Sequence, residues 1–372
     1  MSKIFELFGY RLDAWNKNAV DNCAKAWCPF MDEECDGGGN RYLSALDLRS
    51  RPKLAAKFSG KDIVQAGVCS LSLKEGEQPW IVCPRRLLSL KERSHSMKDH
   101  QTQVKQQLHK FLKSDTDWRV WSEVKMKTGV TSVDGNQEKS FDYTFDYIIS
   151  THQRMKLSDV ATITGKSERS VQKVAEENGY TLARRGDLWV DDFPCGPFLI
   201  IEIMTSSTSG GDKKKRTQIG MAFEDAVLNP ASHNAPGINY RQVWARMVSQ
   251  LIVKSQVAIA WGGITLWLIQ DVLADYISES TALDLSSFLS EQANEVNLLA
   301  FGYGPLECID GDDQILELKC PKLYSGPIDS QGNERAQGSG GFVDIIKIGA
   351  APPQDILWRS LFLKRPCASF ST

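Results

Sequence analysis

Isolated carboxylates interrupt stretches that otherwise have the composition of β-strands. Glu202 lies in the apolar run LIIEIM, Asp142 and Asp146 lie in SFDYTFDYII, and Glu123 lies in WSEVKM. Mg²⁺ prefers oxygen ligands, and phosphodiester hydrolases hold it with a few carboxylates together with the phosphate itself. We therefore expect Glu202 to meet Asp142 or Asp146 around one magnesium ion. The backbone carbonyl of Ile203 would be a further ligand, and Glu123 could supply a carboxylate at a second site.

The alternative interpretation of Glu202 is a residue near a strand end that faces water. Both acid-bearing segments share an aromatic and β-branched setting, which favours the catalytic interpretation. The chain after Glu202 also continues into a basic cluster that is well placed to meet phosphates, namely Lys213, Lys214, Lys215 and Arg216. A lysine run in a Gly/Ser loop is also typical of a solvated surface, so both interpretations of this cluster stay open.

The segments around these acids predict strands and helices of a mixed fold. WRVWSEVKM and SFDYTFDYII alternate apolar and polar residues on either side of the turn-like SVDGN, which predicts a β-hairpin. Apolar residues at helical spacing predict helices over 98–113, around 218–227 and over 240–254. The run 257–268 is expected to be a buried strand, or a strand that continues into a helix.

Between the two acid-bearing strands, the sequence changes to two short predicted helices separated by Gly165, followed by the wing-like RRGDLWV. This spacing is typical of a helix-turn-helix, here an insertion over 152–190 at the tip of a hairpin. One interpretation is a DNA reader, and the other is a helical hairpin that packs on the core or mediates dimerisation. The residues that a DNA reader would present are Lys166, Ser167, Arg169, Ser170 and Lys173. Asp191 and Asp192 would be alternative metal ligands if the insertion lay elsewhere.

Composition and charge narrow the class of protein. The chain has 372 residues and a net charge of -2, from 44 Lys and Arg against 46 Asp and Glu. That balance argues against a protein that coats nucleic acid indiscriminately, although it leaves room for a local basic groove. The N-terminus lacks the pattern of a signal peptide, and no apolar run is long enough to span a bilayer. We expect a cytoplasmic protein with no membrane partner.

Cysteines concentrate in the first part of the chain. Five of the nine precede residue 84, namely Cys23, Cys28, Cys35, Cys69 and Cys83. In a cytosolic chain they are expected to be thiols or metal ligands rather than disulfides. The segments between them are loop-like and include DGGG at 36–39. This composition predicts a small metal-stapled subdomain.

Blocks of the sequence, in their shared order, resemble NotI-type restriction endonucleases. The similar blocks are CPF, EC, GVC and IVCPRR around the cysteines, SFDYT, LIIEIM, INYRQVWARMVSQL and GGITLWLIQDVLADYI. They cover roughly residues 4 to 280. The resemblance implies an α/β (α+β) fold of the PD-(D/E)XK type, with a mixed central sheet flanked by helices over 98–330. The core would follow a four-cysteine region over 1–97, contain the insertion over 152–190 and precede a C-terminal extension over 331–372.

The resemblance also implies function and site residues. It implies a homodimeric type II restriction endonuclease of the bacterial cytoplasm that cuts double-stranded DNA with Mg²⁺, with a cognate DNA methyltransferase in the host. By analogy the target would be rich in G and C. Asp142 and Glu202 would be the catalytic acids. A structural iron or zinc ion would be bound by Cys28, Cys35, Cys69 and Cys83. Their spacing, with six, thirty-three and thirteen intervening residues, matches no standard zinc finger.

One departure from the family pattern concerns the position two residues after the catalytic glutamate. The family has Gln or Lys there, whereas this chain has Met204, whose thioether carries no positive charge. A residue from elsewhere could supply the function, and Lys213, Lys214 and Gln218 are the candidates. The other interpretations are an enzyme that works without it, or a different register. Two alternative functions also stay open: a non-catalytic, metal-stapled DNA-binding regulator, and a repair or modification-dependent nuclease of the same fold.

Overall fold

The computed structural model describes most of the chain. The described ranges are residues 2–74, 76–90, 99–112, 117–131, 138–280, 285–304, 315–316, 318–327 and 353–370. The turn expected at SVDGN and residues 331–352 of the predicted C-terminal extension lie outside them. None of the described helices is long and apolar enough to cross a membrane.

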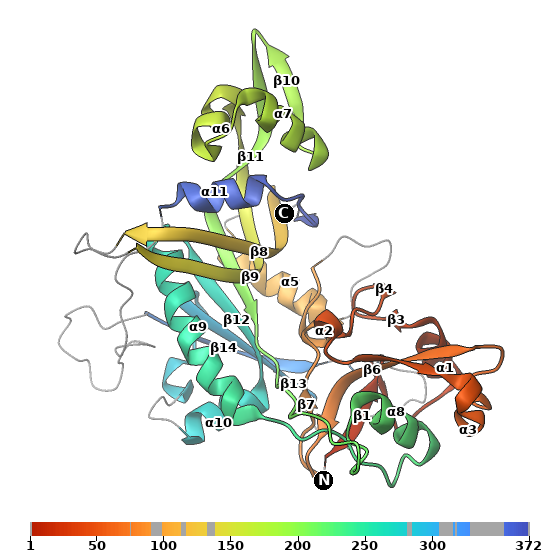
Figure 1. Cartoon of the computed structure of the whole chain (residues 1–372). Helices are drawn as coiled ribbons and strands as arrows, with labels where there is room; N and C mark the ends of the chain where they lie inside the picture. The colour runs from red at the N-terminus through yellow and green to blue at the C-terminus, as the bar shows by residue number, and fades with distance from the viewer. Residues whose placement is uncertain are drawn as a thin grey trace.

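A mixed eight-stranded sheet forms the centre of the molecule (Figure 1). Its strands follow the order β14-β13-β12-β11-β9-β8-β15, and β10 pairs with β11 outside this path. β11, β12 and β13 are parallel, and the other pairs are antiparallel. The strands are β8 (Trp118–Thr131), β9 (Glu138–Lys156), β10 (Leu182–Arg185), β11 (Asp187–Ile203), β12 (Ile264–Gln270), β13 (Val296–Gly302), β14 (Lys319–Gly326) and β15 (Ala368–Phe370). The predicted hairpin is confirmed as β8 and β9.

Helices cover both faces of this sheet, because successive strand residues point to opposite sides. Ile201 of β11 packs in one cluster with Leu108 of α5, whereas Ile200 packs in another with Ala258 of α9. The helices and 3₁₀ turn around the sheet are α5 (Asp99–Phe111), α9 (Tyr240–Ala260), α10 (Asp271–Ser280), η2 (Leu285–Phe288) and α11 (Asp355–Phe362). The helices predicted over 98–113 and 240–254 are confirmed. The buried strand predicted over 257–268 is confirmed from Ile264 onward, as β12, whereas the start of the range is helical because α9 continues to Ala260 and ends before Gly262, where φ is +79°.

A second sheet occupies the N-terminal part of the chain, with the strand order β2-β1-β6-β5 and β7 paired to β6. Its elements are β1 (Lys3–Leu7), β2 (Tyr10–Arg11), α1 (Lys17–Lys25), β3 (Trp27–Cys28), β4 (Glu33–Glu34), α2 (Gly37–Asn40), β5 (Leu43–Asp47), η1 (Leu48–Ser50), α3 (Pro52–Ala55), β6 (Ile63–Ser72), β7 (Trp80–Ile81) and α4 (Pro84–Leu87). The helix predicted around 218–227 forms as α8 (Ile219–Leu228), and its Phe223 stacks on Phe58 of this part. The N-terminal part is therefore not confined to residues 1–97, because α8 supplies some of its core.

A buried polar cluster joins the two sheets. Arg86 and Glu6 are fully buried, and the Arg86 guanidinium lies 3.0 Å from the Glu6 carboxylate. Tyr303, which follows β13, donates its hydroxyl hydrogen to Glu6 at 2.7 Å, and Arg86 also donates to the carbonyl of Leu316 at 2.5 Å. The guanidinium lies over the ring of Phe30. Buried charges need such partners, so this cluster fixes the N-terminal part against the central sheet.

The insertion between β9 and β11 forms a separate head, visible at the top of Figure 1. It contains α6 (Leu157–Thr164), α7 (Glu168–Glu177) and the hairpin of β10 with the start of β11. Gly165 takes the left-handed conformation that ends α6, and Ser167 caps α7 by accepting a hydrogen bond from the backbone N–H of Ser170. The predicted helix-turn-helix spacing is thus confirmed in the structure.

Candidate active site

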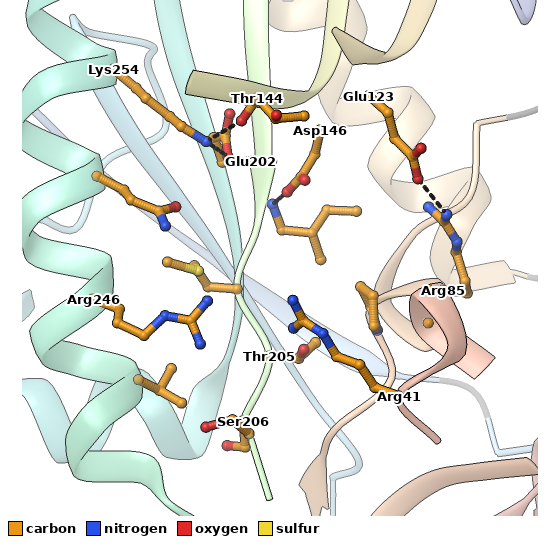
Figure 2. A pocket seen from close by; sticks show the side chains of 18 of the residues that line it. Arg41, Arg85, Glu123, Thr144, Asp146, Glu202, Thr205, Ser206, Arg246 and Lys254 are labelled. Atoms are coloured by element: carbon orange, nitrogen blue, oxygen red, sulfur yellow. Dashed lines mark hydrogen bonds and ion pairs between the residues drawn. The ribbon is translucent and has the colours of Figure 1, made fainter. Parts of the chain in front are cut away.

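A pocket of about 590 Å³ opens where β11 ends. Its walls come from five parts of the chain: β8, β9, the end of β11 with the residues that follow it, one side of α9, and the N-terminal segments around α2 and α4. Four predicted acids line it, namely Glu123, Asp142, Asp146 and Glu202. Figure 2 shows how most of these side chains lie around the pocket.

Glu202 is buried at the floor of the pocket and meets a lysine from α9. The Lys254 ammonium lies 2.5 Å from Oε2 of Glu202 and donates a second hydrogen bond, at 2.7 Å, to the carbonyl of Thr144 (Figure 2). The side chains of Lys254 and Glu202 are only 4% and 2% exposed. Within the described ranges, Oε1 of Glu202 has no hydrogen-bond partner. Burial, and then the nearby charge of Asp146, raise the pKa of Glu202 to about 8.

Asp146 supplies the second carboxylate at this floor. Its Oδ2 accepts a hydrogen bond from the backbone N–H of Ile203 at 2.8 Å, which ties β9 to the end of β11. Burial raises the pKa of Asp146, and the amide of Ile203 and the ammonium of Lys254 act against that rise. Two carboxylates that share a buried site repel each other, so a cation between them would favour the ionised form of both.

Asp142, which the family resemblance assigned as the catalytic partner of Glu202, lies elsewhere in the pocket. Its side chain is 42% exposed and lies 3.9 Å from Lys125 and 3.7 Å from Lys127 on β8. The register explains the difference, because Tyr147 pairs with Ile201, and its neighbour Asp146 therefore lies beside Glu202. The structure thus brings Asp146, rather than Asp142, to the buried carboxylate.

Glu123 lies on the other side of the pocket. The backbone at Glu123 has a φ of +51°, and the pairing between β8 and β9 is interrupted there, opposite Asp146. The carboxylate of Glu123 accepts a hydrogen bond from Arg85 at 3.1 Å. Arg85 also contacts Asp36 at 2.9 Å. Glu123 is therefore held by a cation of the N-terminal part and does not join the pair on the floor.

Two further arginines line the pocket with no ionic partner in the described part of the chain. Arg41 follows α2 and Arg246 lies on α9, and both are exposed. Their guanidinium groups are directed toward each other across the chain that leaves β11 (Figure 2). Arg246, Gln250 and Lys254 are spaced four residues apart and present one side of α9 to the pocket.

The residues predicted to supply the function that Met204 lacks do not line the pocket. Met204 is partly buried against the cluster around α9 and α10, whereas Lys213, Lys214 and Gln218 are not among the lining residues. Lys213, Lys214 and Lys215 are exposed in a turn, and Arg216 contacts Asp225 at 2.7 Å. Lys254, which the sequence analysis missed, is the ammonium that reaches the glutamate.

The four predicted metal-binding cysteines converge in the N-terminal part, where the sulfur of Cys83 lies next to Gly38 of the pocket lining. The thiols of Cys28 and Cys35 are hydrogen-bonded, which lowers the pKa of Cys28, and burial raises the pKa of Cys83 to about 12. Each sulfur accepts a backbone N–H: that of Cys28 from Phe30 and Met31, that of Cys35 from Gly37, that of Cys69 from Gly9, and that of Cys83 from Arg85 and Arg86. Across the described ranges, however, no three His, Cys, Asp or Glu side chains are arranged to hold a metal ion. Cys23 is also buried, and its thiol donates to the carbonyl of Gln65.

The remaining predicted residues lie away from the pocket. Asp191 pairs with Arg154 and Asp192 with Arg119, so neither is positioned to replace Asp146. The candidate DNA-binding residues of the insertion, Lys166, Arg169 and Lys173, are exposed on the head.

Comparison of the chain with protein-family models, curated proteins and solved structures finds no match.

Proposed function

We propose that this protein is a Mg²⁺-dependent endonuclease that hydrolyses phosphodiesters of double-stranded DNA. The observation that carries the proposal is the convergence of Asp146, Glu202 and Lys254, from β9, β11 and α9, on the floor of a pocket with arginines at its sides. Two carboxylates and one ammonium are the groups that this chemistry needs at a scissile phosphate. The sequence resemblance to NotI-type enzymes supports the same reaction.

The donor set of the floor suits magnesium. Both carboxylates are hard oxygen ligands, the carbonyl of Ile203 is adjacent, and Oε1 of Glu202 has no hydrogen-bond partner among the described residues. Mg²⁺ typically takes one or two carboxylates and completes its coordination with water and phosphate oxygens. When bound, it would offset the negative charge that accumulates on the phosphate during hydrolysis.

The protein's own side chains then have distinct roles. The pair formed with Glu202 and the carbonyl of Thr144 fixes the Lys254 ammonium, so that its positive charge faces the pocket at the position where Met204 offers none. Arg41 and Arg246 would bind the phosphates on either side of the scissile one. Water attacks phosphorus, the bond to one ester oxygen breaks, and the products are a phosphate monoester and a free hydroxyl.

The resemblance extends the proposal to a type II, sequence-specific restriction enzyme of the PD-(D/E)XK type. Such an enzyme would act as a homodimer, one pocket for each strand, and its host would protect the target with a cognate methyltransferase. The cysteine cluster of Cys28, Cys35, Cys69 and Cys83 would bind iron or zinc. The backbone N–H groups that donate to these sulfurs would also suit metal-bound thiolates. Among the described residues, however, no three such side chains are arranged to hold a metal ion.

The test is cleavage of supercoiled plasmid by the full-length protein. We expect cleavage with Mg²⁺, none with EDTA, and recovery when Mg²⁺ is restored. Glu202→Gln should remove activity, whereas Glu291→Gln, a matched change at an exposed carboxylate outside the pocket, should not. Cleavage that survives in EDTA or in Glu202→Gln would exclude this site as its source. DNA binding with no cleavage in Mg²⁺ would instead indicate a non-catalytic DNA-binding protein.

A further inference from the structure

The head is built as a three-helix unit with a β-hairpin wing, although its third helix comes from the far end of the chain. α11 packs on α6, and Phe362 of α11 contacts the rings of Tyr180 and Phe193 at 4.9 and 5.4 Å. The Tyr180 hydroxyl donates to the carbonyl of Leu361 at 3.1 Å. The head thus has an apolar core of its own, with Val160 and Val171 fully buried in it. Because α11 completes that core, neither α6 nor α7 needs its outer face for packing.

The outer face of α7 has a polarised charge. Val171 and Ala175 are buried and face the core, which turns Arg169, Gln172 and Lys173 outward in the first six residues of the helix. Two glutamates follow in the last turn, where Glu177 lies 3.6 Å from Lys173. In a helix-turn-helix the N-terminal half of the second helix enters the major groove. Arg169 therefore lies at the end that would approach DNA, next to Glu168 of the first turn, and Lys173 lies in the middle of the helix, whereas Glu176 and Glu177 lie at the other end.

The wing adds cations beside this face. Arg184 of β10 is exposed, and the strands turn at Gly186, where φ is +80°. Lys166 and Arg169 are exposed as well, and none of these three cations has an ionic partner in the described part of the chain. Asp187, directly after this turn, pairs by contrast with Lys156 at 2.9 Å. The cations without partners thus lie along the turn, the second helix and the wing.

We propose that the head is a second DNA-contacting surface that binds duplex DNA through α7 and the wing, apart from the pocket. β9 and β11 run from the floor of the pocket to the head without a linker, so these two strands set the distance between the pocket and the head. Asp146 and Lys156 are ten residues apart on β9, which corresponds to about 33 Å at the rise of a strand. That length is close to one turn of B-DNA, about 34 Å. The claim that pocket and head engage one duplex rests on the proposed function.

The test measures binding by full-length protein in the inactive Glu202→Gln background, by fluorescence anisotropy with a mixed-sequence duplex of about 40 base pairs over a salt series. The head variant combines Lys166→Ala, Arg169→Ala and Arg184→Ala. The control combines Lys53→Ala, Lys57→Ala and Lys61→Ala, which removes the same charge from exposed positions of the N-terminal part. We expect the head variant alone to weaken binding by about tenfold or more and to reduce the salt slope by about 2 to 3 units.

Four outcomes, two from binding and two from footprinting, distinguish this inference from the proposed function. Selective loss of binding by the head variant supports the inference even if no DNA is cut, because it requires no catalysis. Equal affinities for the head variant and the control would overturn it, and circular dichroism checks that both are folded. If cleavage is found, hydroxyl-radical footprinting should show protection about one helical turn from the cut phosphate. Protection confined to the cut site would overturn the inference while leaving the nuclease intact.

Discussion

Replacing Lys254 with methionine tests the central contact of the site. Methionine fills similar space in the buried stripe of α9 but removes the ammonium, which donates to Glu202 and to the carbonyl of Thr144. A buried hydrogen bond to a charged group contributes about 1.5–3 kcal/mol, and removing one partner of a buried ion pair costs about 3–5 kcal/mol. Because Glu202 can take up a proton, its pKa being about 8, we expect a loss of about 2–3 kcal/mol at pH 7.

The loss should grow with pH. An acid whose pKa is raised by folding stabilises the folded state below the unfolded pKa, and that contribution is lost as the pH rises through the folded pKa. In the wild-type protein, this stabilising contribution of Glu202 is almost entirely lost just above pH 8. Without Lys254, which lowers the pKa of Glu202, the folded variant keeps its proton to higher pH and continues to lose stability by about 1.4 kcal/mol per pH unit. The deficit at pH 9 should therefore exceed that at pH 7 by about 1 kcal/mol.

The assay is urea unfolding without Mg²⁺, followed by tryptophan fluorescence at both pH values. Gln250→Met, one turn earlier on the same side of α9, is the stability control and should show a smaller deficit that does not change with pH. The nicking rate of Lys254→Met should also fall by about 100-fold or more, since one charge at the reacting phosphate is removed. A deficit independent of pH, or no larger than that of the control, would refute the buried pair. Wild-type cleavage by Lys254→Met would refute its catalytic role.

Three further predictions test other parts of the site. Asp146→Asn should reduce Mg²⁺-dependent nicking at least about 100-fold, while Asp142→Asn should retain it within about tenfold; the reverse order would favour the family-based assignment. Arg41→Ala and Arg246→Ala should each weaken duplex binding and reduce its salt slope by about 1 unit, measured by anisotropy, and unchanged slopes would remove them as phosphate ligands. Cys28→Ser should lower both the iron or zinc content, measured by mass spectrometry, and the unfolding temperature; protein purified without metal but equally stable would contradict a metal-stapled cluster.

The sequence predicted which strands carry the acids, but it could not choose between Asp142 and Asp146. The two residues are four apart on one strand, so both satisfy the period of two that places a side chain on a given face. Only the register with β11, in which Tyr147 pairs with Ile201, distinguishes them. Register depends on pairing between distant segments and on local irregularities such as that at Glu123, which a pattern within one strand does not contain.

Lys254 had a signal that the sequence analysis did not use. It continues the buried stripe of α9 formed by Val243, Met247, Leu251 and Ala258, where a lysine needs a partner. The pattern could mark the lysine as unusual, although its partner, Glu202, is fifty-two residues away in the sequence. The two helices and the turn of the helix-turn-helix could be predicted, because the turn and caps are local. Its third helix could not, since α11 joins it only through tertiary packing.

The cluster around Glu6 and Arg86 has a consequence for synthesis of the chain. Its acid and its guanidinium are made early, but Tyr303 and the carbonyl of Leu316, which complete their hydrogen bonds, are translated more than two hundred residues later. At roughly 5–20 residues per second, the nascent N-terminal sheet waits on the order of ten seconds or longer for these partners. During that interval its inner surface is exposed on the ribosome, and chaperones have time to bind it.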